Sequence, residues 1–323
     1  MTAAGEPGPG GALLIVGDVV TDVVARHRGP LAPATDTAAS IRTLPGGAGA
    51  NAACWAVRSG RRDVRLLARV GADSAGWHER ELAGAGVRPL LVPDPEVPTA
   101  TVIALVDAAA ERTFLTDSGA VLRLCPDDWS PGLLDGVAAL HLSGYLFFAP
   151  SSRAAALLAL RDARAAGIPV SVDPASAGFL AELGPERFLA AVEGASLLLP
   201  NTDEARLLTG APDAEAAARE LSRRVPLAVV TLGAAGALVA EAGAVTARVA
   251  APAVPADRRL DSTGAGDAFT GAFLAARLSG ADPAEAAGAG CAAGAEAVTV
   301  VGGRPPSDRP PADHPPSGRP PSV

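Results

Sequence analysis

The sequence contains no lysine, and all 27 of its basic residues are arginine. This absence excludes a Walker-A phosphate loop, whose lysine reaches the β- and γ-phosphates, and every mechanism that forms a Schiff base with lysine. Backbone amides must therefore carry much of any phosphate binding. The basic residues form no stripe with aromatics and the net charge is −8, which argues against a nucleic-acid-binding surface.

Cysteine, aromatic residues and long apolar runs are also scarce. The three cysteines, Cys54, Cys125 and Cys291, are widely spaced, so neither a disulfide framework nor a zinc site is indicated. No run of about 18 apolar residues occurs, and residues 1–10 lack the basic and apolar regions of a secretory signal. We therefore expect a cytoplasmic protein that does not enter a membrane.

The alternation of apolar and alanine-rich segments predicts the fold class. With 323 residues, 49% of them hydrophobic, the chain can form one large α/β domain. A mostly parallel sheet with helices on both faces is expected from this order. We expect buried strands over 12–17, 64–71, 137–144, 168–174, 195–201 and 227–233, and helices over 51–59, 77–85, 152–166, 185–192 and 214–223.

Two segments interrupt this alternation, at about 23–44 and 99–116. The second is typical of two strands joined by a turn near 108–112, and we expect both segments to form a small β-sheet lid. The C-terminal segment 304–323 contains eight prolines in twenty residues and has no apolar periodicity. A disordered or extended tail is therefore expected after a body that spans 12–303.

The most distinctive stretch is DSTGAGDAFTGAF, at residues 261–273. Gly264 and Gly266 permit backbone angles and close approaches that a Cβ would forbid, so the amides of Gly264, Ala265, Gly266 and Asp267 can converge on one anion before an apolar helix. An acid beside an anion needs a chemical reason, and a general base that takes a proton from an attacking hydroxyl provides one. The structural alternative is Asp267 as a helix N-cap.

A second glycine cluster, PGGAGANAACWAVRSG, lies at residues 45–60. Its G-x-G-x-x-A spacing imitates a dinucleotide fingerprint, but Pro45 argues against a central strand before it, and we reject that interpretation. Together with 14–22, 200–210 and 231–239, the two clusters resemble in order the ribokinase-like, or PfkB, family of carbohydrate kinases. The resemblance covers about 13–303 and implies a ribokinase-like three-layer α/β/α fold.

The same resemblance implies a set of site residues. For the sugar these are Asp22, Gly46, Gly47 and Asn51, and for ATP they are Asn201, Thr231, Gly233, Gly236 and Cys291. Asn201 and Glu204 would hold Mg²⁺ through water. Asn201 and Glu204 equally fit a helix capping box, with Asn201 as the N-cap and Glu204 three residues later. The capping role and the Mg²⁺ role are compatible. The backbone carbonyls of a K⁺ site would come from Asp261, Thr263, Ala297 and Gly302.

The expected activity is ATP-dependent phosphorylation of a primary hydroxyl of a small sugar or sugar derivative, with Asp267 as general base. Val20 and Ala48 replace residues that are polar in ribokinase, which puts ribose in doubt. A nucleoside kinase of the same fold is one alternative, with Tyr145, Phe147 and Phe148 as the nearest candidates to hold a base. A non-catalytic sugar- or nucleotide-sensing protein is another. A homodimer through the lid is also expected.

Overall fold

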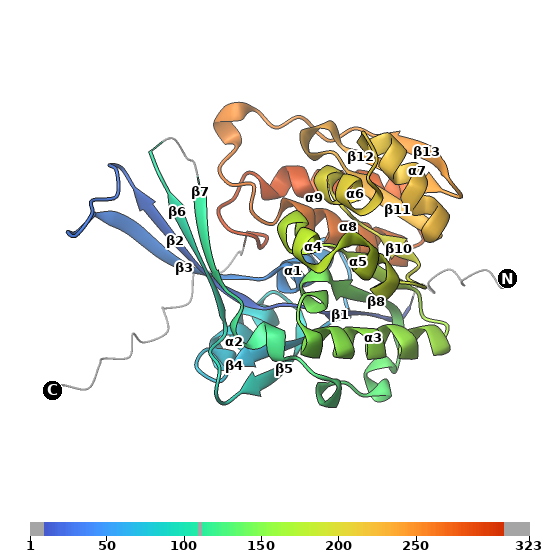
Figure 1. Cartoon of the computed structure of the whole chain (residues 1–323), viewed down its shortest axis with the longest axis horizontal. Helices are drawn as coiled ribbons and strands as arrows, with labels where there is room; N and C mark the ends of the chain where they lie inside the picture. Colours follow the sequence, from blue (N-terminus) through green and yellow to red (C-terminus); the bar gives the residue numbers. More distant parts are fainter. Residues whose placement is uncertain (1–9, 109–111, 307–323) are drawn as a thin grey trace.

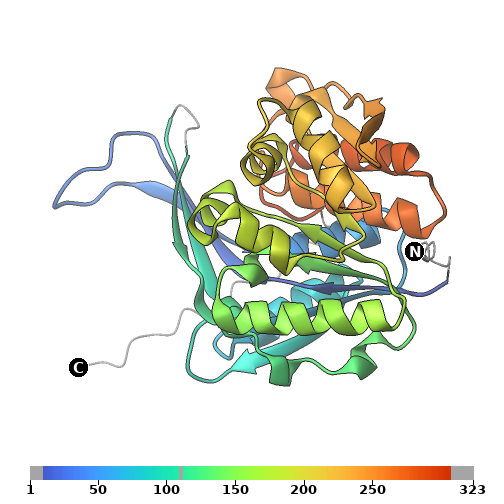
Figure 2. The same ribbon diagram turned by 45° about the vertical axis from the view of Figure 1, so that its right-hand side comes forward.

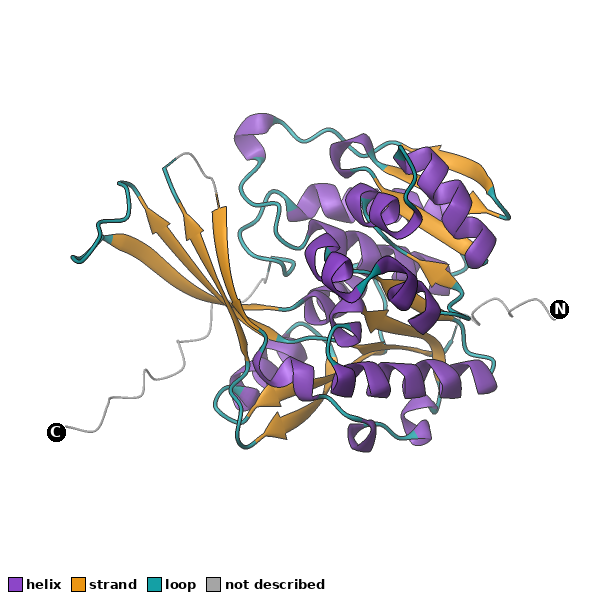
Figure 3. Ribbon diagram, viewed as in Figure 1, coloured by secondary structure: helices purple, strands orange, loops and turns teal. Residues whose placement is uncertain are grey.

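A computed structural model describes residues 10–108 and 112–306 of the chain. Its main sheet has nine strands in the order β13-β12-β11-β10-β9-β8-β1-β4-β5 (Figures 1 and 3). Neighbouring strands from β11 to β5 pair in parallel, whereas β12 and β13 form an antiparallel edge. The strands are β1 (Ala12–Val16), β4 (Val64–Gly71), β5 (Arg88–Asp94), β8 (Val137–Ser143), β9 (Val170–Asp173), β10 (Leu197–Leu198), β11 (Leu227–Thr231), β12 (Ala237–Glu241) and β13 (Ala244–Val249).

Helices cover both faces of this sheet and enclose two apolar layers (Figures 1 and 2). One layer lies beneath α3 (Pro150–Ala165), α4 (Ala177–Leu183), α5 (Pro185–Ala191), α6 (Thr202–Thr209) and α7 (Ala214–Arg224). The other lies beneath α1 (Ala48–Arg58), α2 (Ala75–Gly84), α8 (Ala265–Leu278) and α9 (Pro283–Ala297). The predicted three-layer fold with a mostly parallel sheet is thus confirmed.

Short 3₁₀ turns connect several of these elements. They are η1 (Gly119–Arg123), η2 (Pro126–Asp128), η3 (Pro131–Leu134), η4 (Gly144–Phe147), η5 (Gly233–Ala235) and η6 (Ala256–Arg258). Among the described residues, no helix combines the length and the apolar character needed to cross a membrane.

Several edge elements were not predicted. β5 contains Pro89 and Pro93, and it lies at the end of the strand order, where a residue without an N–H is tolerated. β12 and β13 form a hairpin whose turn has Ala242 at φ 49° and Gly243 at φ 80°. That turn has the positive-φ geometry of two-residue hairpins but lacks the usual Asn-Gly sequence. The hairpin could therefore not be predicted from its turn residues.

The lid is a separate four-stranded sheet, in the order β3-β2-β6-β7, that projects from the main body (Figure 1). Its strands are β2 (Val20–His27), β3 (Ala39–Gly46), β6 (Ala100–Val106) and β7 (Arg112–Asp117). The predicted small sheet is confirmed, but its first strand starts at Val20, so Asp22 lies within the lid. β3 is an edge strand, which explains how it accommodates Pro45. Residues 109–111 of the predicted turn lie outside the described residues.

The chain end differs from the tail prediction at its first residue. Gly302 and Gly303 are buried against the body, and the guanidinium of Arg304 is buried as well. Trp55 Nε1 donates to the Gly303 carbonyl at 2.9 Å, which ties this segment to α1. The body therefore includes Arg304, whereas residues 307–323 of the predicted tail lie outside the described residues.

Candidate active site

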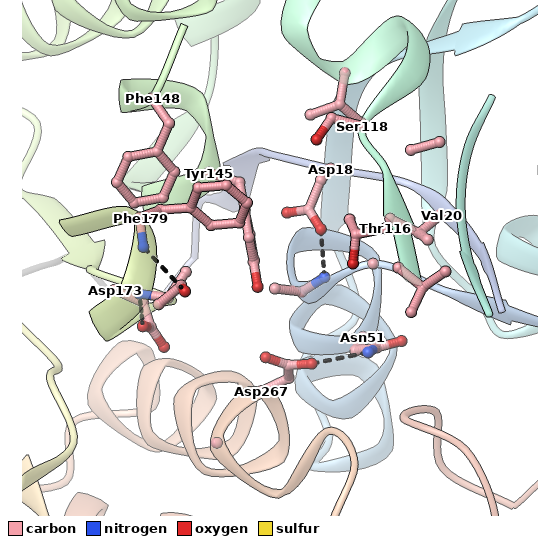
Figure 4. A pocket seen from close by; sticks show the side chains of 18 of the residues that line it. Asp18, Val20, Asn51, Thr116, Ser118, Tyr145, Phe148, Asp173, Phe179 and Asp267 are labelled. Carbon is pink, nitrogen blue, oxygen red and sulfur yellow. Dashed lines mark hydrogen bonds between the residues drawn. The ribbon is translucent and has the colours of Figure 1, made fainter. Parts of the chain in front are cut away.

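A cleft of about 910 Å³ lies between the lid and the carboxyl ends of the central strands. Both glycine clusters contribute to its walls, which brings residues 46–51 and 261–267 together as the motifs suggested. The floor is formed by the first turns of α1 and α8, and the sides by lid strands and by η4 and α4 (Figure 4). The cleft is thus the meeting point of the lid and body.

Asp267 lies in the first turn of α8, where its carboxylate faces the cleft (Figure 4). Asn51 Nδ2, from the first turn of α1, donates to Asp267 Oδ2 at 2.8 Å. The helix N-cap is Gly264, with φ 74°, so the alternative of Asp267 as N-cap is wrong. The two glycine clusters are therefore joined by a hydrogen bond between their polar side chains.

The two glycines of the late cluster have different roles. Gly264 needs its positive φ, and an added Cβ would lie 2.4 Å from Gly303 Cα. Gly266 has ordinary helical geometry and no atom within 4 Å of an added Cβ, so our expectation that it supplies a special backbone angle is wrong. Its lack of a side chain instead leaves open space at the cleft, beside the amides of the first helical turn.

The early cluster is organised around Asp18, which sequence reasoning missed. Its carboxylate accepts from the amides of Ala48, at 2.7 Å, and Gly49, at 3.1 Å, and from the Ser143 hydroxyl at 2.7 Å. Gly47 is the N-cap of α1 at φ 99°, and a Cβ there would meet the Asp18 carbonyl at 2.6 Å. Asp18 lies two residues after the end of β1. A polar residue just after a buried strand was the signal that could have identified it.

Asp22 reaches the cleft from β2 rather than from the end of β1. Gly46 makes room for it, because an added Cβ on Gly46 would lie 2.1 Å from Asp22 Oδ2. Burial raises the pKa of Asp22 to about 7, and the charge of Arg304 opposes that effect. Asn51 is buried, and its Oδ1 has no hydrogen-bond partner among the described residues.

Asn201 and Glu204 form the predicted capping box at the start of α6. Asn201 Oδ1 accepts from the Glu204 amide at 3.0 Å, while Glu204 Oε2 accepts from the Asn201 amide at 2.9 Å. Both residues also line the cleft. Burial and the nearby Asp173 carboxylate raise the pKa of Glu204.

Asp173 is a cleft residue that sequence reasoning did not single out. It ends β9, and its carboxylate accepts from the Thr270 hydroxyl of α8 at 3.1 Å. Burial raises its pKa. Burial also raises the pKa of Asp267 well above the usual range, with the carboxylates of Asp173, Asp18 and Asp22 adding to the rise. The cleft thus gathers acids that repel one another when ionised.

The predicted ATP-binding residues are only partly brought together. Thr231, at the end of β11, lines the cleft beside Asn201. Gly233 has φ 57° and open space around an added Cβ, whereas a Cβ on Gly236 would lie 1.9 Å from the Val249 carbonyl. The approach of β13 is thus by itself sufficient to require glycine at position 236. Cys291, on α9, is buried in the core and does not line the cleft, so its predicted adenine contact is not supported.

The residues predicted for K⁺ lie together around Asp261. Its carboxylate accepts from the amides of Thr263, at 2.8 Å, and Gly302, at 3.1 Å. Ala297 ends α9, and the following Val298 carbonyl accepts from the Leu260 and Asp261 amides. Within the described residues, no cluster of three or more His, Cys, Asp or Glu side chains could hold a metal.

An aromatic group lines the cleft wall opposite the lid (Figure 4). Phe148 and Phe179 stack with ring centroids 5.2 Å apart, and Tyr145 meets Phe179 edge-on at 6.0 Å. Phe179, on α4, was missed because that short helix was not predicted. Phe147 is fully buried in the core and faces Phe188, so it is not a candidate to hold a base.

The sequence profile described as pfkB family carbohydrate kinase matches residues 12–310. The chain belongs to this family. A ribokinase from Mus musculus is 30% identical over 289 residues, which cover 84% of this chain and 85% of that protein. A fructokinase from Klebsiella pneumoniae is 30% identical over 278 residues, which cover 82% and 84% of the two chains.

Solved structures share the fold of this pfkB kinase. An adenosine kinase from Sinorhizobium meliloti superposes with a TM-score of 0.83 at 24% identity, covering 92% of this chain and 96% of that one. An E. coli structure described as a ribokinase II in complex with ATP and Mg²⁺ has a TM-score of 0.80 at 24% identity, covering 91% and 94%.

Proposed function

We propose that this pfkB kinase transfers the γ-phosphoryl group of ATP to a primary hydroxyl of a small sugar or sugar derivative. The observation that carries the proposal is Asp267, an acid in the first turn of α8, at the floor of a large cleft and beside the amides of that turn. A purely sensing protein would gain nothing from an acid at an anion site. The same geometry suits a base that approaches a hydroxyl.

In the proposed step, Asp267 takes the proton of the acceptor hydroxyl while that oxygen forms a bond to the γ-phosphorus. The bond from phosphorus to the bridging oxygen breaks, and ADP leaves with the electron pair. Amides of Ala265, Gly266 and Asp267 stabilise charge on the transferring group. The raised pKa of Asp267 means that its ionised carboxylate is a stronger base than that of an ordinary aspartate.

The acceptor is held by Asp22 and Asn51, with Gly46 and Gly47 providing a close backbone approach. Asn51 Nδ2 is engaged with Asp267, so its unpartnered Oδ1 is the atom that accepts from a sugar hydroxyl. A buried acceptor without a partner is costly, which supports a ligand contact at this atom. The arrangement also connects the acceptor directly to the proposed base.

Magnesium fits the donor set of Asn201, Glu204 and Asp173. Their oxygens are ligands that Mg²⁺ prefers, directly or through retained waters, and the mutual repulsion of Asp173 and Glu204 favours a nearby cation. Bound Mg²⁺ would neutralise charge on the triphosphate. Carbonyls of Asp261, Thr263, Ala297 and Gly302 remain our candidates for K⁺, and Thr231 and Gly233 for the nucleotide.

The lid is proposed to close over the cleft and to pair with the lid of a second copy. One face of the lid lines the cleft through Asp22, Val102 and Phe114. The opposite face presents Ile41, which is 63% exposed, and Leu115, which is 54% exposed. Exposed apolar residues on a sheet face mark an interaction site. Light scattering should report a dimer that Ile41→Asp and Leu115→Asp together convert to a monomer, whereas a monomeric wild type would contradict this.

The test of the function is ADP release with a panel of sugars, sugar acids and nucleosides. We expect at least one sugar or sugar acid to give turnover that depends on Mg²⁺ and is lost in Asp267→Asn. Failure of every acceptor with a folded protein that binds ATP would refute the kinase proposal. We propose a cytoplasmic location, which the three free cysteines support.

A nucleoside acceptor is the second candidate, favoured by the stacked Phe148 and Phe179. Aromatic rings offer an apolar face on which a base can stack, at about 1–3 kcal/mol for each base. If the acceptor is a nucleoside, Phe179→Ala should raise its KM strongly. If the acceptor is a sugar, the same change should have a small effect, so the panel and this variant separate the two candidates.

A further inference from the structure

The segment Gly302–Arg304, which we call the strap, passes between the two halves of the active site. Gly302 donates to Asp261 Oδ2 at 3.1 Å, and the Gly303 carbonyl accepts from Trp55 Nε1 at 2.9 Å. A Cβ on Gly303 would lie 2.2 Å from Asn51 Nδ2, and one on Gly302 would lie 3.2 Å from Leu44 Cδ1 of the lid. The strap therefore contacts the acceptor side, the phosphate side and the base of the lid.

Arg304 follows directly, and its Nε, Nη1 and Nη2 are all buried without a hydrogen-bond partner among the described residues. Burying a charged group without partners is strongly unfavourable, so the working enzyme must supply one. The charge of this guanidinium acts on Asp22, on His78 and on Cys54. The guanidinium is therefore buried within the body, close enough to these three side chains for its charge to affect them.

Of these neighbours only Asp22 can be a counter-ion. Burial, helped by Arg304, lowers the pKa of His78 to about 3, so that ring is neutral, and burial raises the pKa of the Cys54 thiol. His78 Nε2 is paired with the Thr21 hydroxyl at 3.0 Å.

The other acids near Asp22 are already engaged. Asp18 accepts from two amides and a hydroxyl, Asp261 from two amides, and Asp267 from Asn51. The carboxylate of Asp22 makes no hydrogen bond with the described residues, which leaves it as the acid that can receive the guanidinium.

We propose that Arg304 is a positioning residue that acts through Asp22: the strap carries its guanidinium beneath the lid, where it favours the ionised form of the Asp22 carboxylate and orients it for the acceptor hydroxyls. The role in acceptor binding rests on the proposed function, whereas the pairing with Asp22 does not. Three acids, Asp18, Asp261 and Asp267, face Asp22 and disfavour its charge, and Arg304 is the cation that opposes them. The end of the chain thus contributes to the substrate site.

The pairing is tested without substrate, by carbon-13 NMR of the aspartate carboxyl groups in the full-length protein. The Asp22 signal is assigned as the one that disappears in Asp22→Asn. In Arg304→Met we expect Asp22 to titrate at least about one pH unit higher than in wild type, which is a tenfold change in its acid dissociation constant. Arg304→Lys should give an intermediate value. Arg58→Met removes an exposed arginine of α1 and should leave the titration unchanged.

An unchanged Asp22 titration in a folded Arg304→Met protein would overturn the pairing. If that variant does not fold, the intermediate titration expected for Arg304→Lys decides, and wild-type behaviour there would also overturn it. This result is independent of whether the protein is a kinase. A failure of the Arg304–Asp22 pairing can therefore be distinguished from a failure of the proposed kinase activity.

The positioning role is tested by steady-state kinetics with D-ribose and D-fructose as parallel acceptors. Arg304→Met should raise the acceptor KM by roughly tenfold or more, while KM for ATP changes by less than about twofold. Removal of 307–323 should leave both constants unchanged, whereas removal of 304–323 should reproduce Arg304→Met. Equal kinetics for the two truncated proteins would overturn the role. No turnover of either sugar by wild type would count against the proposed sugar kinase, while the NMR result would still decide the pairing.

Discussion

Replacement of Asp267 by asparagine separates the chemistry of this carboxylate from its structural role. Asn51 Nδ2 donates to Asp267 Oδ2 at 2.8 Å, and the amide oxygen of an asparagine at this position can accept the same bond. The helix keeps Gly264 as its N-cap. The fold and the position of Asn51 should therefore survive, while the proton acceptor is lost.

We expect kcat to fall by about 10²- to 10⁴-fold, which corresponds to about 3–5 kcal/mol in activation free energy. The free energy of unfolding should not fall, because burial and neighbouring carboxylates disfavour the ionised Asp267 and the amide removes that cost. Asp267→Ala differs. It leaves the donor of the buried Asn51 without a partner and should destabilise the fold by about 1–3 kcal/mol.

The measurements are ADP release under saturating acceptor and ATP, and thermal unfolding of the three proteins. Glu186→Gln is the matched control, since Glu186 is an acid in the first turn of α5 that does not line the cleft. Wild-type turnover in Asp267→Asn would refute the general base. A loss of stability in Asp267→Asn equal to that in Asp267→Ala would refute the reasoning about Asn51.

Three further outcomes follow from the same geometry. Gly266→Val should keep its fold, because no atom lies within 4 Å of an added Cβ, but should lose activity with ATP, whereas Gly264→Val should reduce the unfolding temperature as well. Asn51→Ala should raise the acceptor KM, at a cost of about 1–3 kcal/mol, and leave KM for ATP nearly constant; the reverse pattern would invert the site map. Asp22 has a pKa raised to about 7, so its protonated form stabilises the fold and this contribution is lost as pH rises towards and through 7. Burial lowers the pKa of His78 and His141 to about 3, and this effect reduces stability only below about pH 6.5. Denaturant unfolding between about pH 6.5 and 8 should therefore show the free energy of unfolding falling as pH rises. The fall should be less steep in Asp22→Asn.

The layers of the fold could be predicted because buried parallel strands and amphipathic helices have strong periodic patterns. The edges could not. β5 contains prolines that argue against a strand, and only its place at the end of the sheet makes them acceptable. The two-strand edge of β12 and β13 depends on positive φ angles at Ala242 and Gly243. An Ala-Gly pair does not by itself indicate such a turn.

The site was predictable where a motif fixes the local backbone, as at Gly264 and in the capping box of Asn201 and Glu204. It was not predictable where a residue acts through tertiary contacts. Asp173 matters because β9 places it beside Thr270 of α8, 97 positions later. Arg304 looks like part of a proline-rich tail, and only the packing of Gly303 against Asn51 and Gly264 brings it into the body.

The absence of lysine and the abundance of acids in the cleft have a joint consequence for nucleotide binding. Asp18, Asp22, Asp173, Glu204 and Asp267 all line a space that must accept a triphosphate, itself strongly negative. Arg153 and Arg187 also line this space, and the amides at the start of α8 provide about half a positive charge, but together they do not offset the more numerous carboxylates. The proposed enzyme should therefore discriminate sharply between free ATP and its magnesium complex. Because the carboxylates with raised pKa ionise as the solution becomes more alkaline, the magnesium requirement should become stricter with rising pH. Magnesium titrations of ATP binding at pH 6.5 and 8.5 measure this directly, and an affinity for free ATP that is equal at both values would contradict the electrostatic argument.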